Sequence, residues 1–245
     1  MTGTELKLEY KEFEPKKDGI PVIIAAAGSS SRMSGLNKQF VKIGGIPVIA
    51  RTMLCFERCN SVSKIIIAAR EEDIPEIQLL ADRYMISKLT DIVSGGSCRQ
   101  DSVKKAFSVL DLGDKKALIH DGARPLVPDS VIKSVVSSLE KYDAVTCAVK
   151  VKDTIKRINS DGLAVETPNR ESLVAVQTPQ GVDIEKYRAA MEKAGDLSLF
   201  TDDMSIMENA GYSAMTVNGS YRNIKITTRE DIAAAEAFTA VNDEE

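Results

Sequence analysis

The chain has 245 residues and a net charge of −4; 43% of its residues are apolar and 28% are charged. This length corresponds to one large or two small domains, and the composition is ordinary for a globular protein. The acidic balance excludes a protein that coats nucleic acid through a basic surface. No apolar run reaches the ~20 residues that a membrane helix needs, and residues 1–18 lack the apolar core of a signal peptide. We therefore expect a cytoplasmic protein with neither a membrane nor a nucleic-acid partner.

Short apolar stretches rich in β-branched residues alternate with amphipathic stretches along the chain. The former are typical of strands buried on both faces of a sheet, and they cover 20–27, 64–69, 90–93, 116–120, 143–149 and 213–217. The helix-like stretches cover 46–59, 72–84, 98–110, 128–141, 183–193 and 202–210, with Asp129 or Ser130 as the expected cap of the fourth. This alternation predicts an α/β fold, in which helices cover both faces of a mostly parallel sheet.

Residues 151–180 interrupt this alternation. A turn signal at Asn159-Ser160-Asp161-Gly162 separates two stretches of alternating polarity, which is typical of a β-hairpin. We expect this segment to be an arm that projects from the main sheet. It belongs to a single predicted domain of residues 19–240, which residues 1–18 precede as an N-terminal extension.

The four cysteines match no zinc or disulfide spacing, so we expect reduced and mostly buried thiols at Cys55, Cys59, Cys98 and Cys147.

The stretch after the first predicted strand has the residue types of a phosphate-binding loop. Gly28 permits close backbone approach, Ser29, Ser30 and Ser31 add hydroxyl donors, and Arg32 and Lys38 add positive charge. A helix that begins here would also present unpaired N–H groups to an anion. The stretch matches neither the Walker pattern nor the three-glycine dinucleotide fingerprint. A simple glycine turn with a solvated arginine and lysine therefore remains a second interpretation.

Three further stretches place charged residues near predicted strand ends. They are SGGSCRQDSV at 94–103, HDGARPLV at 120–127 and RNIKITTREDI at 222–232, where Thr228 is the expected cap of a further helix. The carboxyl ends of parallel strands meet at one edge of a sheet, so the loops after Ala27, Val93 and His120 should share one rim. Several cations and the Asp121 carboxylate then predict a phosphate-rich substrate site, with Asp121 as a candidate Mg²⁺ ligand.

Seven motifs, in order from residue 26 to residue 227, carry a specific resemblance. They are Ala-Ala-Gly-x-x-x-Arg-Met…Lys-Gln, Gly-Gly-x-x-Arg-Gln-Asp-Ser-Val, His-Asp-x-Ala-Arg-Pro, Lys-Asp-Thr-Ile-Lys, Gln-Thr-Pro-Gln, Thr-Asp-Asp and Asn-Ile-Lys-Ile-Thr. The chain thereby resembles the 2-C-methyl-D-erythritol 4-phosphate cytidylyltransferase family of the non-mevalonate isoprenoid pathway. One departure is Ser30, where many members carry glycine.

The resemblance implies a three-layer, Rossmann-like fold of the nucleotide-diphospho-sugar-transferase type, with a projecting β-arm that joins a homodimer. The implied reaction is attack of a polyol phosphate on the α-phosphate of CTP, with Mg²⁺ as cofactor and pyrophosphate as leaving group. Such transfers run on positioning and charge neutralisation. The attacking phosphate oxygen is already ionised, so a general base is not required.

The resemblance also implies a role for each matched residue. Catalysis falls to Arg32, Lys38 and Lys225. Nucleotide binding falls to Ala26, Ala27, Gly28, Ser29, Gly95, Arg99, Ser102 and Asp121, with Asp121 also near the metal. Acceptor binding falls to Arg124, Thr154, Arg170, Thr178 and Thr201. Thr154 and Arg170 lie in the arm and would serve the neighbouring subunit.

Three alternatives share these nucleotide motifs: a ribitol-5-phosphate cytidylyltransferase, a transferase for another base, and a non-catalytic nucleotide-binding protein. The Asp-Thr-Ile-Lys, Gln-Thr-Pro-Gln and Thr-Asp-Asp motifs favour methylerythritol phosphate as acceptor. Arg32, Lys38 and Lys225 argue against a pure binding protein. A Ser-His-Asp hydrolase built on His120 lacks the Gly-x-Ser-x-Gly turn that would support it.

Overall fold

The central sheet of the computed structural model, which describes residues 19–28 and 37–240, has seven strands in the order β11-β7-β10-β6-β1-β4-β5. The strands are β1 (Ile20–Ala25), β4 (Val62–Ala69), β5 (Leu89–Ser94), β6 (Lys116–Asp121), β7 (Ala144–Lys150), β10 (Val174–Asp183) and β11 (Met215–Asn218). β10 runs antiparallel to its neighbours β6 and β7, and the other neighbouring pairs are parallel. The expected mostly parallel sheet is thus confirmed.

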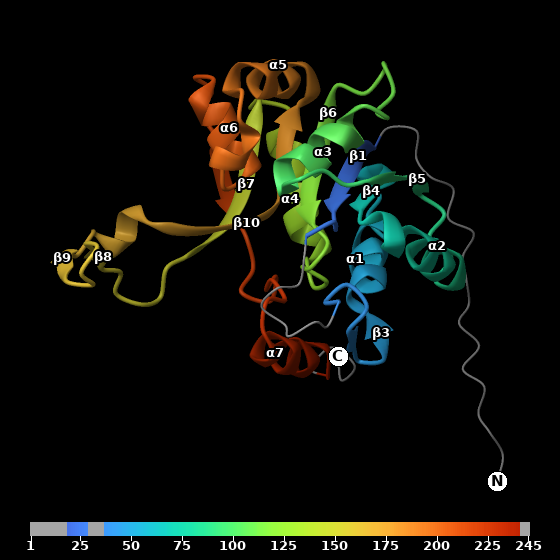
Figure 1. Cartoon of the computed structure of the whole chain (residues 1–245), viewed down its shortest axis with the longest axis horizontal. Coiled ribbons are helices and arrows are strands. Elements are labelled where there is room, and N and C mark those ends of the chain that lie inside the picture. The colour runs from blue at the N-terminus through green and yellow to red at the C-terminus, as the bar shows by residue number, and fades with distance from the viewer. Residues whose placement is uncertain (1–18, 29–36, 241–245) are drawn as a thin grey trace, which may run out of the picture.

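Helices cover both faces of this sheet, as Figure 1 shows. One face carries α1 (Val48–Glu57), α2 (Ile74–Arg83) and α4 (Asp129–Ser138), and the other carries α3 (Arg99–Phe107), α5 (Ile184–Ala194) and α6 (Asp203–Asn209). Side chains alternate along a strand, so Val22 and Ile24 of β1 pack into the first layer and Ile23 packs into the second. A three-layer α/β/α domain follows. Of the described helices, none combines the length and apolar character that a membrane crossing requires.

The last helix, α7 (Arg229–Ala240), lies below the carboxyl edge of the sheet (Figure 1). It packs on a small hairpin, β2 (Lys42–Ile43) and β3 (Ile46–Pro47), and Ala235 shares a buried cluster with Ile43. The expected cap at Thr228 is confirmed, because Thr228 Oγ1 accepts a hydrogen bond from the Asp231 N–H and Asp231 Oδ2 accepts one from the Thr228 N–H. This cap fixes the point at which the segment from the carboxyl edge turns into α7.

Two details at helix starts differ from the sequence prediction. The helix expected from residue 46 begins at Val48, because Gly44 and Gly45, with φ of +52° and +78°, turn the chain into the β2–β3 hairpin. The expected cap of α4 is wrong as well. Pro128 occupies the cap position, and no side chain accepts a hydrogen bond there.

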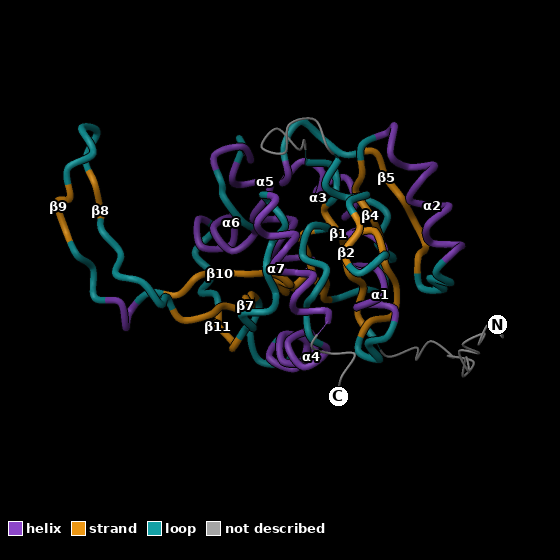
Figure 2. The backbone as a smooth tube through the Cα atoms, turned by 90° about the horizontal axis from the view of Figure 1, so that it is seen from below, coloured by secondary structure: helices purple, strands orange, loops and turns teal. Residues whose placement is uncertain are grey.

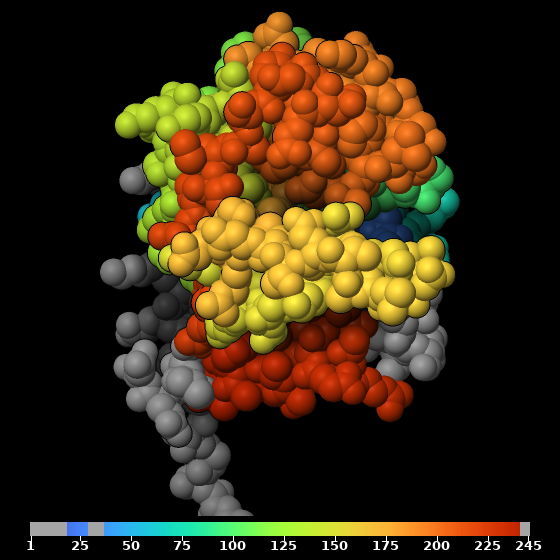
Figure 3. Space-filling view, turned by 90° about the vertical axis from the view of Figure 1, so that its left-hand side faces the viewer, coloured from blue at the N-terminus to red at the C-terminus, as the bar shows by residue number. Residues whose placement is uncertain are grey.

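The arm is present, but it is shorter than predicted. β8 (Arg157–Ile158) and β9 (Ala164–Glu166) pair antiparallel around the predicted turn, and the Asn159 N–H donates to the Leu163 carbonyl. Figures 1 and 2 show this hairpin reaching well away from the sheet, and in Figure 3 it forms a separate ridge in front of the body. Residues 174–180, which were expected in the arm, belong instead to β10 inside the central sheet.

The polar and proline-containing stretch Gln177-Thr178-Pro179-Gln180 explains that error. Such residues are unusual in a central strand, and proline argues against one. Here the register of β10 shifts between Val176 and Gln180, so the ladder is interrupted where the proline lies. Gln180 is fully buried, and its amide donates to Thr146 Oγ1 and to Asp202 Oδ2. These hydrogen bonds satisfy a polar strand in the interior.

Candidate active site

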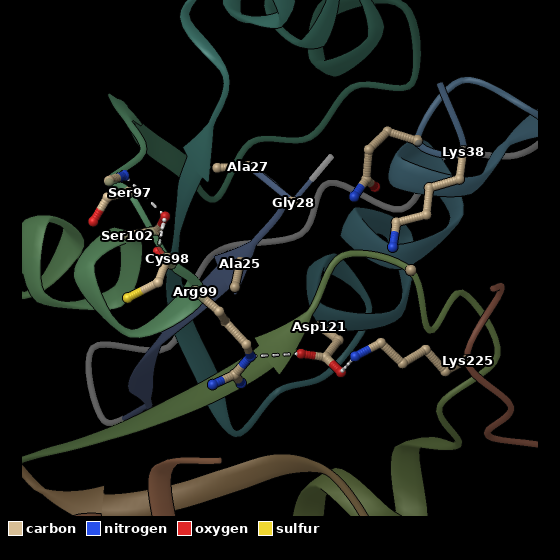
Figure 4. A pocket seen from close by; sticks show the side chains of 13 residues that line it. Ala25, Ala27, Gly28, Lys38, Ser97, Cys98, Arg99, Ser102, Asp121 and Lys225 are labelled. Atoms are coloured by element: carbon tan, nitrogen blue, oxygen red, sulfur yellow. Dashed lines mark hydrogen bonds and ion pairs between the residues drawn. The ribbon is translucent and has the colours of Figure 1, made fainter. Parts of the chain in front are cut away.

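A cavity of about 420 Å³ opens at the carboxyl edge of the sheet (Figure 4). Its walls come from the end of β1, the loop between β5 and α3, the end of β6 and the segment before α7. The lining residues are Ala25, Ala27, Gly28, Lys38, Gln39, Gly96, Ser97, Cys98, Arg99, Ser102, Asp121, Ala123 and Lys225. The expected convergence of three strand-end loops on one rim is therefore confirmed.

The loop between β5 and α3 is organised by a serine and a glycine. The Ser102 hydroxyl accepts a hydrogen bond from the Gly96 N–H at 2.9 Å and donates to the Cys98 carbonyl at 2.9 Å. Gly95 is packed so closely that a Cβ there would lie 2.3 Å from the Ala27 Cβ. Only glycine at this position lets the β5 loop meet the β1 loop, and the two together form one wall of the cavity.

Asp121, the last residue of β6, is the centre of a cluster of cations. Its carboxylate lies 2.9 Å from Arg99 Nε, 2.8 Å from Lys225 Nζ and 3.6 Å from Arg124 Nε. Burial raises the pKa of Asp121, but the charges of Arg99, Lys225 and Arg124 outweigh it and hold the pKa well below its ordinary value. Asp121 is thus ionised at neutral pH, and the cluster keeps a net positive charge that suits a phosphorylated ligand.

Two lysines extend into this cavity from opposite ends of the chain. Lys38 follows the loop after β1, Lys225 precedes α7, and both line the cavity; Figure 4 shows the Lys225 side chain pointing at the Asp121 carboxylate. The other predicted groups of this loop, which are Ser29, Ser30, Ser31 and Arg32, lie outside the described residues.

A second cavity, of about 490 Å³, adjoins the first. Arg99, Asp121 and Lys225 line both cavities. The further lining residues are Arg124, Thr146, Val176, Gln177, Thr178, Gln180, Thr201, Asp202, Met204, Ser205, Glu208, Ala214 and Thr216. The predicted acceptor residues Arg124, Thr178 and Thr201 are therefore brought together. Two ligands bound side by side would meet at the charged cluster.

The single histidine has a structural environment. His120 is fully buried; its Nε2 lies 3.1 Å from the Arg124 carbonyl and its Nδ1 lies 3.0 Å from Thr178 Oγ1. A carbonyl only accepts, so Nε2 carries the proton and Nδ1 accepts from Thr178, which in turn accepts from the Asp121 N–H at 3.0 Å. Burial lowers the pKa of His120 to about 4, so the ring is neutral at pH 7. The ring is hydrogen-bonded to the loop after β6 and lines neither cavity.

Four predicted site residues do not line either cavity. Ala26 is buried and its carbonyl accepts from the Gln39 side chain, while Gly95 packs behind Ala27. Thr154 and Arg170 are exposed on the arm, where the Arg170 guanidinium donates to the Lys152 carbonyl at 2.7 Å. Within the described chain these two are remote from the charged cluster, so their predicted roles depend on a second subunit.

The structure also brings in residues to which the sequence prediction gave no role. Gln39, Ser97 and Cys98 line the first cavity, and Gln177, Gln180 and Asp202 line the second. Gln39 and the two β10 glutamines lie within the quoted motifs, next to predicted residues. Their position in the sequence, close to Lys38 and Thr178, was the signal from which a place in the site could have been predicted.

Metal ligands are sparse in this region. Among residues 19–28 and 37–240, no group of three or more His, Cys, Asp or Glu side chains could hold a metal ion. Asp121 is the one carboxylate that lines the described part of the first cavity. Mg²⁺ is often bound by one or two carboxylates together with substrate phosphates, so this donor set fits a metal that arrives with a triphosphate.

Comparison with known proteins places this arrangement in a family. The family model described as IspD, 2-C-methyl-D-erythritol 4-phosphate cytidylyltransferase, matches residues 20–240. The chain belongs to this family. A protein of that name from Halalkalibacterium halodurans is 47% identical over 221 residues, which cover 89% of this chain and 96% of the relative. One from Geobacillus kaustophilus is 42% identical over 221 residues, covering 89% and 96%.

Solved structures of the family agree with the fold. The crystal structure of a 4-diphosphocytidyl-2C-methyl-D-erythritol synthase from Anaerococcus prevotii superposes with a TM-score of 0.81 at 33% identity, covering 91% of this chain and 96% of that one. The enzyme of this family from Thermus thermophilus gives a TM-score of 0.73 at 26% identity, covering 90% and 98%. The expected Rossmann-like cytidylyltransferase fold is confirmed.

Proposed function

We propose that the protein transfers the cytidylyl group of CTP to 2-C-methyl-D-erythritol 4-phosphate, which gives 4-diphosphocytidyl-2-C-methyl-D-erythritol and pyrophosphate. Family membership and the names of the relatives support this reaction. The observation that carries it is the pair of adjoining cavities that share Arg99, Asp121 and Lys225. A nucleotide in the first and a polyol phosphate in the second would meet at these three side chains.

The mechanism that fits this geometry is a direct in-line displacement. An oxygen of the acceptor phosphate forms a bond to the α-phosphorus of CTP, and the bond from that phosphorus to the bridging oxygen of pyrophosphate breaks. Charge on the non-bridging oxygens rises as the phosphorus becomes five-coordinate, and Lys38, Lys225 and Arg32 would stabilise it. No proton has to be removed from the nucleophile, which agrees with the neutral and buried state of His120.

Mg²⁺ is the proposed cofactor. Asp121 would be its protein ligand, and the phosphates of CTP would supply the others. The metal would offset negative charge on the triphosphate when bound. This chain's own residues would orient the two phosphates, with Lys225 and Arg99 on either side of the Asp121 carboxylate.

The arm is proposed to join two copies of the single domain 19–240 into a homodimer. It exposes four apolar side chains, Ile155, Ile158, Leu163 and Val165, which a partner would cover.

We also propose a cytosolic location. The four cysteines are free, and burial raises the pKa of Cys59 to about 11 and that of Cys147 to about 12, which suits unreactive thiols in a reducing compartment.

The test is pyrophosphate release with Mg²⁺, measured for CTP, UTP, ATP and GTP against both methylerythritol phosphate and ribitol 5-phosphate. We expect turnover with CTP and methylerythritol phosphate at least ~10²-fold faster than with the other pairs, because a site that pairs buried polar groups with one base rejects the others. Preference for ribitol 5-phosphate would reassign the acceptor. Nucleotide binding without turnover for any acceptor would indicate a non-catalytic binding protein.

A further inference from the structure

The Thr201-Asp202-Asp203 motif contains a buried charge that the proposed mechanism does not use. Asp203, the first residue of α6, is 0% exposed. Its Oδ2 lies 2.9 Å from Arg99 NH1, and this is its one ion pair within the part of the chain that the structure describes. A carboxylate in such a place is costly unless a cation and hydrogen bonds compensate it, so the partnership with Arg99 is what permits its burial.

One further group orients the Asp203 carboxylate, and another holds its backbone. The Tyr187 hydroxyl, also fully buried, donates to Oδ1 at 2.7 Å, which leaves Oδ2 for Arg99. The Asp203 N–H donates to Gln180 Oε1 at 3.0 Å, so the start of α6 is tied to β10. Burial and the Asp203 charge raise the pKa of Tyr187 well above its ordinary value, so the hydroxyl keeps its proton and remains a donor.

Arg99 occupies the wall between the two cavities. It begins α3, and its guanidinium reaches Asp121 through Nε and Asp203 through NH1, each at 2.9 Å. Figure 4 shows the Asp121 side of this bridge, in which the Asp121 carboxylate lies between Arg99 and Lys225. The two carboxylates come from β6 and α6, so one guanidinium joins three elements at the boundary of both ligand sites.

We infer that Asp203 is a positioning residue of the transfer reaction, which holds the Arg99 guanidinium in the wall between the nucleotide and acceptor cavities. This inference rests on the proposed function. Asp121 is shared by three cations, whereas Arg99 is the one cation that pairs with Asp203 among the described residues. Burial lowers the pKa of Arg99, yet the Asp203 and Asp121 charges outweigh it and raise the pKa above its ordinary value.

The ion pair with Asp203 should keep Arg99 in place when the phosphates of the ligands enter the cavities. A triphosphate attracts every nearby cation, and an arginine held by Asp121 alone would be drawn out of the wall together with Lys225. Asp203 holds Arg99 through a second nitrogen, independently of Asp121 and Lys225, and opposes that movement. The guanidinium then stays where it contacts both ligand sites, and the phosphates keep their alignment for in-line attack.

The test compares Asp203→Asn, which keeps the shape and removes the charge, with Tyr187→Phe, which keeps the ring and removes the donor. We expect Asp203→Asn to lower kcat about 10²-fold and Tyr187→Phe to lower it about 5-fold, measured at CTP concentrations that calorimetry shows to fill the site. Arg99→Lys should be as defective alone as it is together with Asp203→Asn, because the aspartate acts through the arginine.

A matched control separates positioning from mere stability. Asp114→Asn removes an ion pair with Lys64, 2.8 Å long, which lies at the amino end of β4 and away from both cavities. It should lower the melting temperature and leave kcat and both KM values unchanged. If Asp203→Asn behaves in the same way, or adds fully to Arg99→Lys, the inference is wrong. If Asp203→Asn does not fold, unchanged kinetics of Tyr187→Phe decide against it. Absent turnover of the unmodified chain would instead count against the proposed function.

Discussion

Lys225 Nζ lies 2.8 Å from Asp121 Oδ2, and this ion pair joins the segment before α7 to the carboxyl end of β6. The lysine is more than a third exposed, so a phosphate oxygen can compete with the carboxylate for it. Lys225 therefore pairs with Asp121 in the described structure, and the proposed reaction gives it a phosphate oxygen as a second partner. The ion pair itself adds little stability at this exposure.

Lys225→Ala is expected to lower kcat about 10²- to 10³-fold, with a smaller effect on KM for CTP, because charge on the α-phosphate changes most in the five-coordinate state. Lys38→Ala should behave alike. Steady-state pyrophosphate release checks both, and Lys225→Arg is the control that keeps the charge. A variant with normal kcat and a raised KM would place that lysine in ground-state binding.

Gly95→Ala tests the close approach of the β1 and β5 loops. The new methyl group would lie 2.3 Å from the Ala27 Cβ, a contact that no side-chain rotation relieves. We expect about 2 kcal/mol of lost stability, or a melting temperature roughly 4–8 °C lower, and a raised KM for CTP. Gly113→Ala is the matched control, since a methyl group added there would meet no heavy atom within 4 Å. Equal melting temperatures for the two variants would contradict the proposed packing.

The lowered pKa of His120 leads us to expect a specific pH dependence of the free energy of unfolding. Burial lowers its pKa from 6.5 in the unfolded chain to about 4 in the folded one. The unfolded state then binds the proton first, so the free energy of unfolding should fall as pH drops from 6.5 to 4, by up to about 3 kcal/mol, and this effect should level off below pH 4. Denaturant unfolding of the wild type and of His120→Gln measures it. The variant should show a flatter slope between pH 6.5 and 4, and parallel curves would refute the assignment.

Asp121 acts in a different pH range. Its folded pKa is far below the ordinary value of 3.8, so its stabilising contribution is fully present above about pH 4 and is lost as pH falls further. The two groups can therefore be told apart in one titration, because the His120 effect ends where the Asp121 effect begins.

The sequence predicted the parallel part of the sheet because local composition determines it. Ile20–Ala25 and Val62–Ala69 are short runs rich in β-branched residues and largely buried. Such runs are typical of strands that are covered on both faces of a sheet. The meeting of Arg99 and Asp121 followed from topology, since both lie close to the carboxyl ends of parallel strands. Lys225 was among the cations that the stretch 222–232 offered, and its role came from the family resemblance. The hydrogen bond from the Ile226 N–H to the Ala123 carbonyl explains its position.

What could not be predicted depends on partners distant in the chain. Gln180 is too polar for a central strand until Thr146 and Asp202 are seen to satisfy it. Asp203 resembles any helix-start carboxylate until its ion pair with Arg99, which lies far earlier in the chain, is known. Neither environment leaves a periodic signal in the sequence. Each is determined by contacts with single side chains that lie far away in the chain, whereas a periodic signal arises when a whole face of a helix or strand is buried.

The last prediction concerns the arm and the subunit in which Arg170 acts. Arg170 is exposed and lines neither cavity of its own chain, although the resemblance assigns it to the acceptor phosphate. In a two-fold dimer in which each arm crosses to the neighbour, Arg170 could be remote from the cavities of its own chain and still reach the acceptor phosphate of its partner. Such a dimer would also cover Ile158 and Leu163, which are 61% and 65% exposed. Arg170→Ala should then be nearly inactive. Arg157→Ala, which breaks a surface pair with Glu166 in the same arm, is the control and should retain activity.

Mixing subunits shows in which chain Arg170 acts. Arg170→Ala and Lys225→Ala homodimers each lack one group at every site. After subunit exchange, a heterodimer contains one site that lacks both groups and one that has neither defect, because the arm of the Lys225→Ala chain supplies Arg170 to the intact Lys225 of its partner. Activity should therefore rise on mixing to about a quarter of the wild-type value, since half of the dimers are mixed at equilibrium and each has one working site of two. If exchange is demonstrated by mass spectrometry and activity does not rise, Arg170 acts within its own chain or has no part in catalysis.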